Sequence, residues 1–134
     1  MAERRQRVLV IDDEPHVREL WVEFVRACGC DAEVATDGPD GVARVHAGRY
    51  DVVVTDFHMP GMNGRAVAQA IRHEDAGAGV ILITGSIEES DAELPSEPGV
   101  MVLRKPINFA DFRVALRDCL VRRAEQPAAI GSPA

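Results

Sequence analysis

The first apolar run of the chain is VLVIDDEP, residues 8–15. Four apolar residues suit a buried strand, and three acids and a proline follow them directly. Asp12 and Asp13 repel each other, because at an effective dielectric near 20 two carboxylates about 4 Å apart cost roughly 4 kcal/mol. We therefore expect a cation beside this end of the strand.

Length and composition indicate a single domain. The chain has 134 residues, of which 46% are hydrophobic, and these values are usual for one domain with one core. The formal net charge of -7 disfavours nucleic-acid binding, because such proteins concentrate Lys and Arg on one face. No apolar run approaches the roughly 18 residues of a membrane span, and the N-terminus does not resemble a signal peptide. We expect a cytoplasmic protein without a membrane partner.

The cysteines and histidines do not form the pattern of a disulfide framework or a zinc site. Three cysteines are an odd number in a chain without an export signal. Cys28-Gly29-Cys30 lacks the two-residue spacer of common zinc pairs, and Cys119 is far away. The histidines follow no ligand spacing; they are His16, His46, His58 and His73. We expect structural cysteines and mostly exposed histidines.

Short apolar runs alternate with helical patterns. Runs of Val and Ile that are apolar on both faces suit parallel strands with helices on each side. They occupy residues 8–11, 52–54, 80–83 and 100–103, with a weaker run at 32–35. Three- and four-residue spacing and capping residues predict helices from Pro15 to Gly29, after Gly38-Pro39, after Asn63-Gly64, and from an N-cap at Asn108 to Arg122-Arg123. The alternation predicts an α/β fold, one doubly wound five-stranded parallel sheet with helices on both faces.

Two parts of this pattern lead to more specific expectations. The first helix places Trp21 and Phe24 on its apolar stripe, so we predict that both are core residues. Residues 87–99, IEESDAELPSEPG, hold five acids and two prolines, and a full helix cannot continue through prolines. We expect at most about two turns before Pro95, so that a fourth helix is short or irregular. We assign residues 1–6 to an N-terminal extension, 7–123 to the domain and 124–134 to a disordered tail.

Polar residues follow several of the predicted strands. In doubly wound sheets, ligands bind beyond the carboxyl ends of the strands. These ends carry Asp12-Asp13, Asp56, Thr84 and Lys105. The first turn lacks the glycines of a dinucleotide site, whereas oxygen ligands at this charge density suit Mg²⁺. A carboxylate nucleophile, with a lysine, a hydroxyl group and Mg²⁺ around the phosphoryl oxygens, would form a phosphoryl-transfer site.

The charged residues of this set also have purely structural explanations. Asp12-Asp13 could cap a helix in a solvated turn, Asp56 could cap the next loop, and Lys105 could be a surface lysine. Independent caps have no reason to converge with a lysine on one sheet edge. We therefore favour a common site.

Four segments together resemble the receiver domains of two-component response regulators, of which CheY is the familiar example. They are VLVIDDEP (8–15), TDFHMPGMNG (55–64), ITG (83–85) and RKP (104–106), and the resemblance covers roughly residues 7–121. It implies a flavodoxin-like fold with strand order 2-1-3-4-5 and Mg²⁺ as cofactor. It also implies a signalling domain that accepts a phosphoryl group from a histidine kinase or histidine phosphotransfer protein and loses it slowly, rather than a turnover enzyme.

The resemblance implies roles for the acidic residues. Asp56 would be the phosphoacceptor. Asp13 and Asp56 would bind Mg²⁺ directly together with the backbone carbonyl of His58, and Asp12 would act through water. The His58 side chain could also lie near the phosphoryl group and alter its lifetime.

The resemblance also implies roles for residues in the second half of the chain. Thr84 would hydrogen-bond the phosphoryl group, Lys105 would form an ion pair with it, and the peptide bond between Lys105 and Pro106 would be cis. Val102 stands where the family often has an aromatic residue that reorients on phosphorylation. Because residues 87–99 also depart from the family pattern, we expect signalling through ordering of a loop and a downstream protein target bound through residues 87–123.

Alternative functions remain at this point. Phosphatases of the haloacid dehalogenase type also use an aspartyl nucleophile and Mg²⁺, but they have a second aspartate two residues later, where this chain has His58. A binding module that keeps the fold without being phosphorylated is another possibility. A receiver could be a stand-alone regulator or part of a larger protein such as a hybrid kinase.

Overall fold

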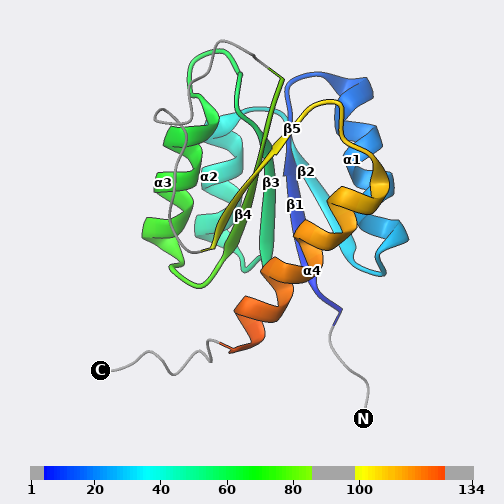
Figure 1. The fold of residues 1–134 in the computed structure, drawn as a ribbon. Coiled ribbons are helices and arrows are strands. Elements are labelled where there is room, and N and C mark those ends of the chain that lie inside the picture. The colour runs from blue at the N-terminus through cyan, green and yellow to red at the C-terminus, as the bar shows by residue number, and fades with distance from the viewer. Residues whose placement is uncertain (1–4, 86–98, 126–134) are drawn as a thin grey trace.

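Five parallel strands form one sheet in the computed structural model of the chain, which describes residues 5–85 and 99–125 (Figure 1). Their order is β2-β1-β3-β4-β5, which confirms the predicted doubly wound topology. The strands are β1 (Arg7–Ile11), β2 (Asp31–Ala35), β3 (Val52–Asp56), β4 (Gly79–Thr84) and β5 (Val100–Arg104). Each predicted apolar run lies within one of these strands, and the strands extend slightly beyond the runs.

The helices lie on both faces of the sheet, as predicted. They are α1 (Pro15–Ala27), α2 (Gly38–Ala47), α3 (Gly64–Glu74) and α4 (Phe109–Glu125). Figure 1 shows α2 and α3 on one side and α1 and α4 on the other. The last helix continues to Glu125, past the predicted end at Arg122-Arg123. The expectations for residues 87–98 and for the tail beyond residue 125 lie outside the described residues.

Capping residues explain where the helices begin. Asn63 accepts a hydrogen bond from the amide of Ala66 at 2.9 Å, and Asn108 accepts one from the amide of Asp111 at 2.8 Å. Such caps satisfy amide groups that have no partner within the helix. These contacts confirm the predicted starts of α3 and α4. At the other end of α1, Gly29 has a φ of 83°, a left-handed conformation suited to glycine, and the helix ends as predicted.

The core forms one hydrophobic layer on each face of the sheet. Side chains of a strand point alternately to opposite faces, so Leu9 and Ile11 pack in the layer beneath α2 and α3, whereas Val8 and Val10 pack beneath α1 and α4. All four are fully buried, and burying a side chain of this size contributes roughly 1.5–3 kcal/mol. The packing is tight: a Cβ atom added to Gly41 of α2 would clash with the Ile11 side chain.

Ion pairs of the largely buried Arg123 side chain hold the amino-terminal edge of the sheet together with the end of α4. Arg123 donates two hydrogen bonds to the Asp75 carboxylate, at 2.8 and 2.7 Å. Its Nε lies 3.8 Å from Asp51 Oδ1, and the Arg123 side chain is 9% exposed. Arg123 holds the pKa of Asp75 below its usual value, against the opposing effect of burial. These contacts attach the last turn of α4 to the segment that follows α3.

No helix in the described ranges combines the length and apolar character that a membrane crossing requires.

Candidate metal centre

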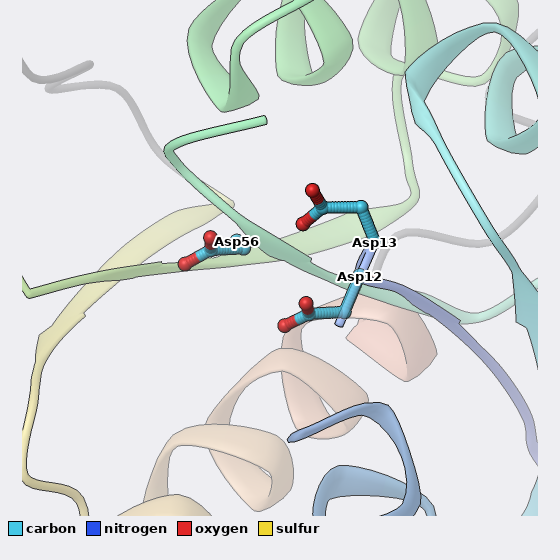
Figure 2. Close-up of side chains that lie close together, drawn as sticks. All are labelled: Asp12, Asp13 and Asp56. Carbon is cyan, nitrogen blue, oxygen red and sulfur yellow. The ribbon is translucent and has the colours of Figure 1, made fainter. Parts of the chain in front are cut away.

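Three aspartates meet at the carboxyl end of the sheet. One carboxylate oxygen from each of Asp12, Asp13 and Asp56 lies within 4.8 Å of the other two. β1 and β3 are neighbours with Ile11 paired to Thr55, so the next residue of each strand, Asp12 and Asp56, arrives at the same edge. Figure 2 shows the carboxylates of Asp12 and Asp13 extending toward the side on which Asp56 lies. The structure thus confirms that residues far apart in the sequence converge here.

Burial makes this concentration of charge costly. Asp12 is 1% and Asp56 8% exposed, whereas Asp13 is exposed. Burial is the main cause that raises the pKa of Asp12, and the nearby charge of Asp56 adds to it. Burial likewise raises the pKa of Asp56, against the opposing influence of Lys105. Both groups therefore favour a cation beside their ionised forms.

Lys105 supplies positive charge at one side of the cluster. Its Nζ lies 3.4 Å from Asp56 Oδ1, and its side chain is 37% exposed. A Cβ atom added to Gly85 would lie 3.1 Å from Lys105 Cδ, so a side chain at position 85 would crowd the lysine. The peptide bond between Lys105 and Pro106 is cis, as expected. One partly exposed lysine does not balance three carboxylates.

Thr84 lies beside Asp56 and Lys105 through the pairing of the strands. Asp56 is paired with Ile83, so Thr84 extends β4 by one residue beyond the level of Asp56. The Lys105 amide donates to the Thr84 carbonyl at 2.8 Å. Thr84 is fully buried. Strand geometry therefore brings a hydroxyl-bearing residue to the same edge, as predicted.

The structure argues against the simplest structural explanation for Asp12-Asp13. The N-cap of α1 is Glu14, whose carboxylate accepts a hydrogen bond from the His16 amide at 3.3 Å. The Asp12 carboxylate instead accepts hydrogen bonds from the Glu14 amide at 2.9 Å and from the Trp21 indole N–H at 3.3 Å. Glu14 as cap and Trp21 as donor were not predicted. A buried Trp usually finds a hydrogen-bond acceptor, and that preference was the available signal for the second contact.

The structure also describes two further residues that the sequence analysis singled out, His58 and Val102. His58 is exposed, and its ring lies 5.3 Å from the Phe57 ring. Together with Lys105 it opposes the rise that burial causes in the pKa of Asp56. The role of its backbone carbonyl as a metal ligand stays a prediction. Val102 is partly buried against the hydrophobic layer beneath α2 and α3, so the position holds an aliphatic side chain packed on the core.

The donors available in the cluster fit Mg²⁺. They are carboxylate oxygens, which Mg²⁺ prefers, and one or two carboxylates with water are its usual protein ligands. Two of the three carboxylates are buried and gain from a nearby positive charge. Asp12, Asp13 and Asp56 would hold the ion.

Comparison with known proteins identifies a matching family and several relatives. Residues 8–117 match the response regulator receiver domain family. The DNA-binding response regulator MtrA of Mycolicibacterium smegmatis is 33% identical over 129 residues, which cover 96% of this chain and 56% of MtrA. The transcription factor prr1 of Schizosaccharomyces pombe is 32% identical over 77% of this chain and 19% of its own length. The chain thus spans about half of the MtrA relative and a smaller part of prr1.

Among solved structures, the response regulator protein TrrA from Thermotoga maritima in complex with Mg²⁺-BeF has a TM-score of 0.78 and 32% identity, covering 86% of this chain and 99% of TrrA. The receiver domain of the hybrid histidine kinase CckA has a TM-score of 0.71 and 28% identity, covering 85% of this chain and 98% of that domain. The family is one of signalling phosphoacceptors that interact with histidine kinases, rather than turnover enzymes. With its sheet order, its acidic cluster and these relatives, the chain belongs to the family of response regulator receiver domains.

Proposed function

We propose that this receiver accepts a phosphoryl group on Asp56 from a phosphohistidine of a histidine kinase or histidine phosphotransfer protein, in a Mg²⁺-dependent reaction. The observation that carries the proposal is the convergence of Asp12, Asp13 and Asp56 with Lys105 3.4 Å from Asp56. The Mg²⁺-BeF complex of TrrA, a relative with 32% identity, supports the choice of metal.

The side chains present suit each part of this reaction. A carboxylate oxygen of Asp56 would form a bond to phosphorus while the bond from phosphorus to the donor imidazole breaks, and the electron pair would return to that nitrogen. Lys105 would hold one phosphoryl oxygen by charge, and the Thr84 hydroxyl group would hold another. Mg²⁺, when bound, would neutralise negative charge on the carboxylates and the phosphoryl group. Asp13, Asp56 and the His58 carbonyl would be its direct protein ligands, and Asp12 would act through water.

The phosphorylated form would then change its protein contacts, so we propose a downstream protein target that binds through residues 87–123. A shift from 1:99 to 99:1 between two states requires about 5.5 kcal/mol, which new charge-assisted hydrogen bonds at the site could supply in part. We do not propose DNA binding, because the net charge is -7. The cytoplasm stays the predicted compartment, and the domain would act alone or within a larger protein.

Intact-mass measurement after incubation with acetyl phosphate and Mg²⁺ tests the proposal. We expect a gain of one phosphoryl group in the wild type and in Asp118→Asn, which changes an exposed aspartate on α4. Asp56→Asn and removal of Mg²⁺ should both abolish the gain. No adduct in the wild type would favour a binding module without phosphorylation, and continuous release of phosphate at a high rate would favour a phosphatase.

A further inference from the structure

Trp21 of α1 contacts the acidic cluster directly. Its indole Nε1 donates to Asp12 Oδ2 at 3.3 Å, while the Glu14 amide donates to Asp12 Oδ1 at 2.9 Å. Trp21 is 3% exposed and Asp12 is 1% exposed. A different donor therefore holds each oxygen of this buried carboxylate, one from the backbone and one from a side chain.

These donors determine how Asp12 faces the other two acids. A buried carboxylate has little contact with water, so its hydrogen-bond donors fix its orientation. Side chains that hydrogen-bond to metal ligands are known to set ligand orientation, and their removal commonly weakens metal binding 10–100-fold. Asp12 would hold the ion through a water molecule, so the lower end of this range applies to its hydrogen-bond partners. The Trp21 N–H is in the position to act in this way on Asp12.

The Trp21 ring is itself fixed by an aromatic cluster, which consists of Trp21, Phe24, Phe109 and Phe112. Trp21 is parallel to Phe112 of α4, with ring centroids 6.1 Å apart and an angle of 2° between the planes. Phe24 contacts Trp21 edge-on at 5.7 Å and contacts both Phe109 and Phe112 at 5.3 Å. Such contacts have preferred geometries. A displacement of the indole would therefore displace the rings of Phe109 and Phe112 at the start of α4.

We propose that Trp21 is a positioning residue for the cation site: it orients Asp12 through its indole N–H and connects the occupancy of the site to the first turns of α4 through the aromatic cluster. This inference rests on the proposed function, because it takes Asp12, Asp13 and Asp56 as the cation site. The ring contacts from Trp21 to Phe112 would also connect the site to α4, in a chain that has Val102 at the position of the family's switching aromatic residue.

Calorimetric titration with Mg²⁺ tests the positioning role. Trp21→Phe keeps an aromatic ring in the cluster and removes the N–H donor, so we expect its Mg²⁺ dissociation constant to rise about tenfold. Tyr50→Phe is the matched control, because it also keeps an aromatic ring and removes a buried side-chain donor, but the Tyr50 hydroxyl group donates to Glu33 of β2, outside the acidic cluster and the aromatic cluster. Its dissociation constant should stay within about twofold of the wild type. Equal affinity of Trp21→Phe and wild type would overturn the proposal.

Fluorescence gives a readout that does not depend on a variant. Trp21 is the single tryptophan of the chain, so its emission should change with Mg²⁺ and saturate at the concentration at which the calorimetric signal saturates. Amide hydrogen exchange in residues 109–116 should change over the same range in the wild type and respond much less in Trp21→Phe. If Mg²⁺ binds calorimetrically but neither signal changes, this inference fails and the metal site stands. If the wild type does not bind Mg²⁺, the metal-dependent function and this inference fail together.

Discussion

Replacing Asp56 by Asn should make the domain more stable when no divalent ion is present. The Asp12 and Asp56 carboxylates are both buried, and their ligand oxygens lie within 4.8 Å of each other. At that separation and an effective dielectric of about 20, two unit charges repel by about 3.5 kcal/mol. Asn at position 56 removes this repulsion and also the cost of burying the charge.

The loss of charge at position 56 also weakens its attraction to Lys105. That pair is 3.4 Å apart, but the lysine side chain is 37% exposed, so water screens it and it contributes only about 1 kcal/mol. The Asn side-chain oxygen could still accept a hydrogen bond from Lys105. The repulsion relieved exceeds the attraction lost, so Asp56→Asn should be more stable than the wild type by about 2.5 kcal/mol.

Urea unfolding at pH 7.5 in EDTA measures this difference, with Asp118→Asn as the control for loss of an exposed acid. Excess Mg²⁺ should reduce the advantage, because a ligand at 100 times its dissociation constant stabilises the folded wild type by about 2.7 kcal/mol. The folded-state pKa of Asp56 is raised, so the wild type loses stability as the pH rises from the unfolded value through the folded value. The advantage of the variant should therefore disappear at acidic pH. A variant less stable than the wild type in EDTA at pH 7.5 would refute this reasoning.

Two further substitutions test the packing. Arg123→Met leaves the Asp75 and Asp51 carboxylates without the guanidinium and should lower the free energy of unfolding by about 3 kcal/mol. The control Arg122→Met, on the exposed side of α4, should change the free energy of unfolding by less than about 0.5 kcal/mol. Equal effects of the two variants would contradict a stabilising ion pair at Arg123. Because Arg123 lowers the pKa of Asp75, the stability that this pair contributes is present above the ordinary pKa near 3.8 and is lost as the pH falls through the lowered folded-state pKa. Acid unfolding curves of Arg123→Met should lack that loss. Gly41→Ala should lower the free energy of unfolding in urea by about 1–2 kcal/mol, because the added Cβ clashes with the fully buried Ile11 and this outweighs the better helix propensity of Ala. A stabilised variant would contradict this and show that the hydrophobic layer beneath α2 and α3 can adjust.

The sequence predicted the sheet because its strands are buried on both faces. Apolar residues at every position of Val8–Ile11 and Val80–Ile83 distinguish such strands from amphipathic helices, and helix starts at Asn63 and Asn108 followed from local capping chemistry. The end of α4 was placed too early. Arg122 and Arg123 suggested a charged, fading terminus, but Arg123 turns inward to Asp75, and a local pattern does not contain that contact.

The site was predictable for a related reason. Parallel strands bring their carboxyl ends to one edge, so the acids at the carboxyl ends of β1 and β3 had to meet regardless of their distance in sequence. What the sequence did not reveal was how they are held. The contact from Trp21 to Asp12 and its continuation through Phe112 depend on how α1 and α4 pack on the same face, which is a tertiary arrangement. From its spacing alone, Trp21 was an ordinary core residue.

Reductive trapping of the phosphorylated residue tests the central claim most directly. Borohydride converts an aspartyl phosphate to homoserine, which peptide mass spectrometry locates in the sequence. After incubation with acetyl phosphate and Mg²⁺, the account predicts homoserine at position 56 and unmodified aspartate at positions 12 and 13. Homoserine at position 12 or 13, or its absence from all three, would contradict the assignment of Asp56 as the residue that carries the phosphoryl group.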